Sequence, residues 1–162
     1  MMNKVLCSLL LFLSISCGLQ GRNANYARDS KRIWLDSKEI HHGEYVWKMK
    51  KAGDVISSAE KVSTLGYDTS DWLSAIVPGT VLNSLVYNKE YPEPYYGVNN
   101  KLESGKIPDI SKVGREFYTY WFRTEFDVPE SFAGKTIWLQ PDGVNYRAEI
   151  WVNGNLLSTL NG

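Results

Sequence analysis

The chain has 162 residues, of which 43% are hydrophobic and 22% are charged. A chain of this length forms about one domain with its own core, so it is too short for a complete large enzyme. Lys plus Arg and Asp plus Glu are both 18, and the zero net charge argues against a nucleic-acid-binding protein. The aromatic content of 13% excludes a disordered chain, because such chains are poor in aromatic residues.

Residues 1–17 are typical of a secretory signal. Lys4 precedes an apolar run that is too short to span a membrane as a helix. Cys17 directly after the run resembles a lipobox cysteine, which is acylated, although the small residues around it also suit an ordinary signal peptidase. Both readings predict export, to the periplasm or as an outer-membrane or cell-surface lipoprotein of a bacterium. Because Cys7 is the only other cysteine, no disulfide is expected in the mature domain.

The folded domain is expected over residues 32–162, after a polar, aperiodic linker at residues 18–31. Short strands are predicted at residues 34–35 and 45–49, and residues 57–63 are ambiguous.

An apolar segment at residues 71–88 divides at Pro78-Gly79. Residues 72–77 predict a strand, and Thr80 predicts the N-cap of a short helix.

Residues 91–110 predict a long irregular loop with three prolines and two glycines. Long loops on compact domains are usually functional or disordered. Tyr91, Tyr95 and Tyr96 favour an ordered loop, because disordered segments rarely carry three tyrosines.

The C-terminal part predicts paired strands. Residues 117–128 alternate between an apolar and a mixed face, and residues 136–140 predict a further strand. Asn-Gly at positions 153–154 predicts a tight hairpin between strands at residues 146–152 and 155–160, because type I′ turns need two positive φ values. Short strands with frequent turns and no long helix predict an all-β, antiparallel β-sandwich.

No catalytic machinery is evident in the chain. Glycoside hydrolysis needs two carboxylates held around one bond, but the acidic residues here are scattered. Glu125 and Asp127 share a strand face and are expected to be solvated. No zinc-type cysteine pair, nucleophile elbow or phosphate-binding loop occurs. The sequence therefore predicts a binding surface, with no catalytic residue, no metal and no cofactor.

The aromatic residues have two interpretations. Most of the six tryptophans are expected in the core, because their rings supply large buried area. Sugars present flat CH faces and many hydroxyls, so a sugar site combines exposed rings with amide and carboxylate partners. Residues 93–100 have this mixture. A purely structural loop is the open alternative.

Four ordered segments carry a family resemblance: VPGTVLNSL (77–85), YPEPYYGVNN (91–100), FYTYWFRTEFDVP (117–129) and WLQPDGVNYRAEIWVNG (138–154). Their order and separations resemble the N-terminal sugar-binding domain of glycoside hydrolase family 2, in its β-mannosidase and exo-β-D-glucosaminidase branch. The resemblance covers roughly residues 32–162. It implies a galactose-binding-like jelly-roll β-sandwich that precedes immunoglobulin-like domains and a TIM barrel in a retaining glycosidase.

The resemblance implies a non-catalytic role for this chain. The family's catalytic glutamates lie in the barrel, the acid/base after an Asn, and the chain has no Asn-Glu dipeptide. Since the family's domain continues past Gly162, the sandwich is expected to be truncated at its C-terminal end and inactive alone. By position, Glu93, Tyr95, Tyr96 and Asn99 match the family's pocket loop and are expected to contact the substrate or a neighbouring domain.

The expected function is therefore that of the N-terminal sugar-binding domain of an exo-glycosidase, which hydrolyses O-glycosyl bonds during polysaccharide or glycan breakdown. The implied partners are a terminal β-linked sugar, of mannose or glucosamine type, and the downstream immunoglobulin-like and barrel domains. Nucleic acid is not expected, and membrane contact only through a lipid on Cys17. Two alternatives stay open: a free-standing carbohydrate-binding lipoprotein, and a purely structural interdomain module.

Overall fold

The structure, a computed structural model, describes residues 3–12, 33–37, 40–41 and 44–161. The strands are β1 (Asn3–Phe12), β2 (Ile40–His41), β3 (Glu44–Tyr45), β4 (Lys48–Lys51), β5 (Leu73–Ser74), β6 (Thr119–Val128), β7 (Arg147–Val152) and β8 (Asn155–Asn161). The α-helices are α1 (Ala59–Val62), α2 (Val81–Tyr87) and α3 (Ile110–Val113). Four 3₁₀ turns are η1 (Ala52–Asp54), η2 (Leu102–Ser104), η3 (Arg115–Tyr118) and η4 (Glu130–Phe132).

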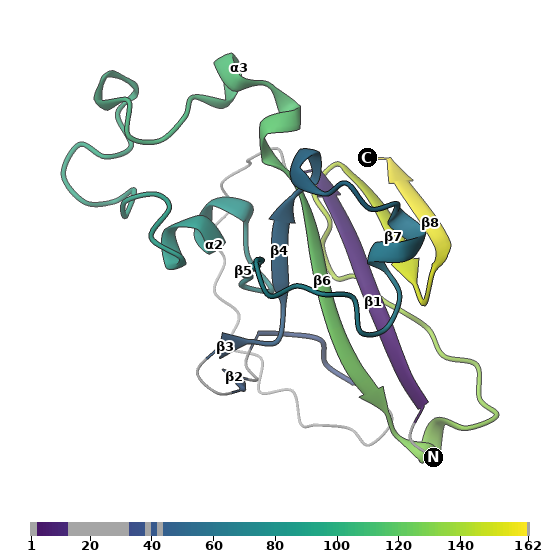
Figure 1. The fold of residues 1–162 in the computed structure, drawn as a ribbon. Helices are drawn as coiled ribbons and strands as arrows, with labels where there is room; N and C mark the ends of the chain where they lie inside the picture. Colours follow the sequence, from purple (N-terminus) through teal and green to yellow (C-terminus); the bar gives the residue numbers. More distant parts are fainter. Residues whose placement is uncertain (1–2, 13–32, 38–39, 42–43, 162) are drawn as a thin grey trace.

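The main sheet has six strands in the order β5-β4-β6-β1-β7-β8, and every neighbouring pair is antiparallel (Figure 1). A second, two-stranded sheet pairs β2 with β3. Figure 1 shows α2 beside β4 and β5 at one end of the sheet, and the β7–β8 hairpin at the other end. The described chain is thus mostly strands in antiparallel sheets with a few short helices.

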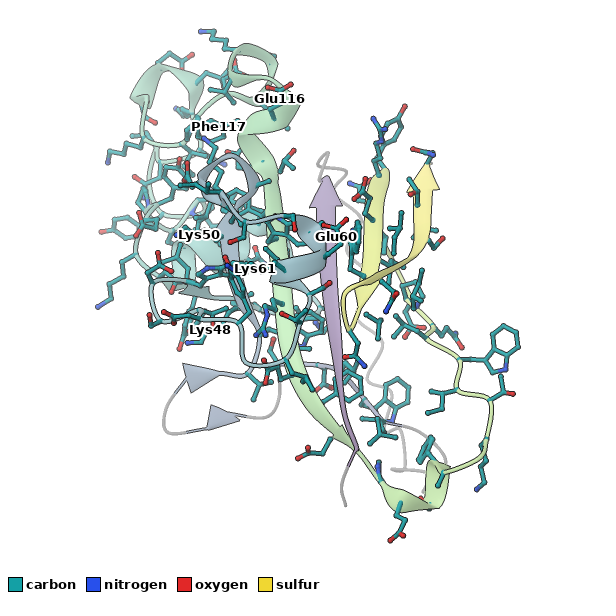
Figure 2. The ribbon with its side chains drawn as sticks, turned by 45° about the vertical axis from the view of Figure 1, so that its right-hand side comes forward. Lys48, Lys50, Glu60, Lys61, Glu116 and Phe117 are labelled. Carbon is teal, nitrogen blue, oxygen red and sulfur yellow. The ribbon has the colours of Figure 1, made fainter. Side chains whose placement is uncertain are left out.

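Strand β6 forms the centre of the core, because both of its faces are covered. Its first six residues are all buried, although the sequence alternation predicted one apolar and one mixed face. One face packs in a cluster with β4 and α2, whose buried members are Trp47, Met49, Ala75, Val81, Leu85, Tyr118, Tyr120 and Phe122. The other face packs under α1 in a cluster of Val62, Trp72, Trp121 and Trp151. Figure 2 shows Glu60 and Lys61 of α1 in front of the sheet.

A buried cation, Arg123, ties α1 to β6. The residue is only 4% exposed, and its guanidinium donates to the backbone carbonyls of Val62 and Thr64 at 3.0 and 2.9 Å and to the carboxylate of Glu125. Glu125 also accepts from the backbone N–H of Gly66 at 2.8 Å. Of the two carboxylates expected to be solvated, Asp127 is exposed, whereas Glu125 is only partly solvated because it pairs with the buried Arg123.

Two local predictions are confirmed. Thr80 caps α2, because its hydroxyl accepts from the backbone N–H of Asn83 at 3.0 Å. The β7–β8 hairpin turns at Asn153 and Gly154, with φ values of 48° and 83°. These positive values are what a type I′ turn requires, which explains the Asn-Gly pair.

The N-terminal run, which the sequence analysis assigns to an export signal, forms a strand in the structure. Asn3–Phe12 forms β1 between β6 and β7 and pairs antiparallel with both (Figure 1). The physical reason is that the run has no Pro or Gly over ten residues, so its backbone can pair with the edges of both β6 and β7 and satisfy their open N–H and C=O groups. Its removal as an export signal stays a prediction. Cys17 and the linker at 18–31 lie outside the described residues.

Other predicted strands are absent or shorter. Residues 34–35 and 136–140 form no strand, and β5 covers only two residues of the predicted 72–77. Trp138, expected in the core with most tryptophans, is 87% exposed, and Ile137 is 52% exposed. Residues 136–140 are apolar enough for a strand, but no described strand pairs with them. The sequence pattern alone therefore predicted a strand that does not form.

Within the described ranges, no helix has the length and apolar character to cross a membrane.

Candidate functional site

The candidate site is the loop at residues 88–109, which extends away from the sheet beyond α2 (Figure 1). Asn88, the C-terminal cap of α2, anchors its beginning. The Asn88 amide donates to the backbone carbonyls of Ser74 and Ser84 at 2.7 and 2.6 Å and accepts from the N–H of Ser74 at 3.2 Å. The loop therefore leaves α2 from a point that is fixed to β5.

The far end of the loop is anchored as well. Asp109 caps α3, and hydrogen bonds from the hydroxyl and backbone N–H of Ser111 lower the pKa of Asp109. Tyr118 in η3 donates from its hydroxyl to the carbonyl of Pro108 at 3.5 Å. Both ends of the loop are thus held against elements of the core.

Asn99 organises the middle of the loop. It is only 5% exposed, and its Nδ2 donates to the carbonyl of Glu93 at 2.9 Å while its Oδ1 accepts from Lys106 Nζ at 2.9 Å. Its own carbonyl accepts from the Ser104 hydroxyl at 3.2 Å. These bonds connect distant residues of the loop, so both polar atoms of the Asn99 side chain are used to hold the loop together.

Tyr95 and Tyr96 are the exposed rings of the loop. They are 85% and 77% exposed, on a backbone turn in which Tyr96 N–H donates to the Glu93 carbonyl at 3.2 Å. The Glu93 carboxylate accepts from the backbone N–H of Tyr95 at 3.3 Å. Gly97 follows with a φ of 59°, a conformation that favours glycine and turns the chain back toward Asn99. Two aromatic rings and one exposed carboxylate therefore stand on a cross-linked loop.

The structure brings the four predicted residues into one turn, but it divides their roles. Glu93, Tyr95 and Tyr96 face solvent, whereas Asn99 is buried. Sequence reasoning missed Asn88 and Lys106. An Asn directly after an apolar helix is a recognisable cap signal, but nothing local indicates that Lys106 reaches Asn99.

The chemistry of this loop is that of recognition. Rings stack on the CH faces of a sugar, and the Glu93 carboxylate accepts hydrogen bonds from its hydroxyls. Within the part of the chain that the structure describes, no group of three or more His, Cys, Asp or Glu residues could hold a metal ion.

Comparison with known proteins identifies the domain. Residues 47–162 match the glycosyl hydrolase 2 galactose-binding domain-like family. The chain is 41% identical over 87 residues to a mannosylglycoprotein endo-β-mannosidase of Lilium longiflorum, a match that covers 54% of this chain and 9% of that protein. It is 28% identical over 104 residues to an exo-β-D-glucosaminidase of Amycolatopsis orientalis, covering 64% of this chain and 9% of the relative.

A second exo-β-D-glucosaminidase, of Streptomyces avermitilis, is 29% identical over 113 residues, covering 69% of this chain and 11% of the relative. The matches thus span only about a tenth of the length of these relatives. No solved structure matches the chain significantly. The predicted all-β antiparallel class and the predicted family are both confirmed: the chain belongs to the glycosyl hydrolase 2 galactose-binding domain-like family.

Proposed function

We propose that this chain is the N-terminal sugar-binding domain of an exported family 2 exo-glycosidase that acts on terminal β-linked mannose or glucosamine-type sugars. The observation that carries the proposal is the pair of exposed tyrosines, Tyr95 and Tyr96, on a loop that is fixed at both ends and across its middle. The names of the relatives support the class of sugar.

The role of the domain is to hold sugar, not to break the glycosidic bond. A retaining glycosidase needs two carboxyl groups about 5 Å apart. On the candidate loop, the Glu93 carboxylate already accepts from the backbone N–H of Tyr95, and no described contact places a second carboxylate with it. The bond-breaking carboxylates belong to the barrel that family 2 enzymes carry elsewhere.

Fixing the loop in advance matters for affinity. An ordering cost of about 0.5–1.5 kcal/mol per side chain is avoided where a binding element is already rigid. The loop's hydrogen bonds through Asn88, Asn99 and Tyr118 serve this purpose. The exposed rings can then contact a sugar without a prior folding step.

Export belongs to the same proposal. The apolar run before Cys17 suits secretion, and acylation of Cys17 would hold the enzyme at a membrane surface. A mass shift of the mature N-terminus, lost in Cys17→Ser, is the expected result for a lipoprotein. An unmodified mature N-terminus elsewhere contradicts lipidation but leaves export intact.

Calorimetric titration with β-1,4-mannobiose and with the β-1,4 disaccharide of glucosamine tests the binding role. We expect Tyr95→Ala and Tyr96→Ala each to weaken binding by about 5-fold to 10-fold, since a stacking contact on an aromatic ring is worth about 1 kcal/mol. Leu102→Ala is the matched control, because Leu102 is a 65% exposed apolar residue of the same loop. Equal affinity of all four proteins for both sugars contradicts the proposal.

Sequencing the gene beyond codon 162 tests the enzymatic part separately. A continuing frame with an Asn-Glu pair in a barrel pattern supports the glycosidase. A stop codon in a chain that still binds sugar instead supports a free-standing carbohydrate-binding lipoprotein.

A further inference from the structure

A hollow of about 320 Å³ lies at the edge of the main sheet, and neither Tyr95 nor Tyr96 lines it. It is lined by residues of β4, η1, β5, α2 and β6 and by the start of the loop: Met49, Lys50, Lys51, Asp54, Asp71, Leu73, Leu85, Glu90, Tyr91 and Tyr120. Strand β5 pairs only with Lys48 and Met49, so the next two residues of β4 have no strand on that side. The hollow lies where this strand pairing stops.

One wall of the hollow carries two tyrosines. Tyr120 is only 8% exposed, yet it lines the hollow, and no residue in the described part of the chain hydrogen-bonds its hydroxyl. Tyr91 lines the same wall. Burial, together with Tyr91 and the carboxylates of Asp54 and Glu90, raises the pKa of Tyr120 to about 12, so its hydroxyl stays protonated. Because Tyr120 lines the hollow and no described residue bonds its hydroxyl, that group is available to donate a hydrogen bond to a ligand.

The charges around the hollow leave two carboxylates available. Lys50 pairs with Asp71, and Lys51 Nζ lies 4.6 Å from the centre of the Phe117 ring. Figure 2 shows Lys50 on β4 and Phe117 on the same side of the molecule. Asp54 and Glu90 are exposed at the rim, and neither carboxylate is hydrogen-bonded within the described ranges. They can accept hydrogen bonds from a ligand.

The remaining wall is apolar. Met49 and Leu85 are buried core residues that reach the hollow, and Leu73 is half-buried beside them. An apolar wall opposite hydroxyls and carboxylates matches the two-sided chemistry of a sugar ring, which has CH faces and hydroxyl edges. The volume lies at the lower end of the range for small-molecule sites, which suits one ring rather than a chain.

We propose that this hollow is a second carbohydrate site, which binds one sugar ring through the hydroxyls of Tyr91 and Tyr120 and the carboxylates of Asp54 and Glu90. It rests on the proposed function only for the class of ligand. Because neither Tyr95 nor Tyr96 lines the hollow, it would hold a different sugar unit from the one on these rings.

NMR titration of the whole chain with methyl β-D-mannopyranoside and methyl β-D-glucosaminide tests this site. We expect a dissociation constant of about 1–10 mM for at least one of them, as is usual for a single small ring. Tyr120→Phe is expected to weaken that binding about 5-fold, the equivalent of one hydrogen bond, and Glu90→Gln by a similar factor. Tyr146→Phe is the matched control, because Tyr146 is an exposed tyrosine of the segment before β7 and does not line the hollow.

The outcomes separate this site from the loop. Weaker binding in Tyr120→Phe and Glu90→Gln, with Tyr95→Ala unchanged, supports the hollow. Loss of binding in Tyr95→Ala with Tyr120→Phe unchanged overturns the hollow and leaves the proposed function standing. Absence of binding by both glycosides up to about 50 mM also overturns it. Because Glu90 is exposed, Glu90→Gln keeps the test valid even if Tyr120→Phe unfolds.

Discussion

Replacing Asn99 by alanine separates the order of the candidate loop from its contact with sugar. The substitution removes the bond from Nδ2 to the Glu93 carbonyl and the bond from Lys106 Nζ, both 2.9 Å long. The neutral bond is worth about 1 kcal/mol. The bond from Lys106, an exposed residue, is worth about 0.5–1 kcal/mol after solvent screening. The ordered loop should therefore lose about 1.5–2 kcal/mol.

Hydrogen exchange measures this loss directly. Amides of the loop turns, such as Lys101 N–H bonded to the Val98 carbonyl at 3.0 Å, should exchange about 10-fold to 30-fold faster in Asn99→Ala. Amides of β6 should keep their rates, because the core is untouched. Sugar affinity should fall by no more than that factor, since only the population of the binding-competent loop changes.

Two controls complete this experiment. Asn100→Ala removes an exposed amide next to Asn99 and should change neither exchange nor affinity. Tyr95→Ala should weaken sugar binding while the loop amides keep their exchange rates. Unchanged loop exchange in Asn99→Ala, or equal acceleration in β6, would refute the reasoning that Asn99 holds the loop.

Three further predictions concern the body of the domain. Arg123→Met leaves the Val62 and Thr64 carbonyls and the Glu125 carboxylate without their donor, so chemical denaturation should show a loss of about 3 kcal/mol; a loss below about 1 kcal/mol contradicts the role of Arg123. The folded-state pKa of Tyr120, about 12, lies above the ordinary value of 10.0, so the folded state keeps this proton longer and stability should fall as pH rises from 10 to 12. In Tyr120→Phe the stability should fall less steeply between pH 10 and 12, and an unchanged pH profile counts against the assignment. Cys7 is the register partner of both Thr124 and Val152, and one of these pairs must be non-hydrogen-bonded. In protein that keeps its N-terminal residues and carries Cys17→Ser, Thr124→Cys or Val152→Cys should form a disulfide with Cys7. If neither variant forms a disulfide, the placement of β1 is contradicted.

The elements that were predicted correctly are those whose structure depends on residues adjacent in the sequence. Thr80 before an apolar run and Asn-Gly at positions 153–154 act through their own backbone groups, so neighbouring residues suffice to identify them. Strand β6 has a two-residue period, which is visible without its partners.

The features that sequence missed depend on distant partners. Both faces of β6 are buried because α1 and α2 cover them, and Arg123 is buried because the carbonyls of α1 receive it. No periodicity within β6 reveals this, since a buried arginine in a strand has the same sequence pattern as an exposed one. The pairing of residues 3–12 with β6 and β7 likewise depends on strand edges that are far away in the sequence.

The candidate loop was predicted in part. Its Tyr, Asn and Glu residues indicated a sugar-facing loop, and composition alone cannot tell which of them face solvent. The structure makes the distinction through burial: Tyr95 and Tyr96 are exposed, and Asn99 is 5% exposed and bonded to Lys106. Substrate contact is therefore proposed for Tyr95, Tyr96 and Glu93, and Asn99 is a positioning residue.

The most direct test of the account is a map of the bound sugar on the loop. Intermolecular nuclear Overhauser effects would be recorded between β-1,4-mannobiose, or the glucosamine disaccharide, and the aromatic protons of the chain. The account predicts contacts from the sugar CH protons to the rings of Tyr95 and Tyr96. Contacts confined to other aromatic residues, or none in a complex that binds, would contradict it.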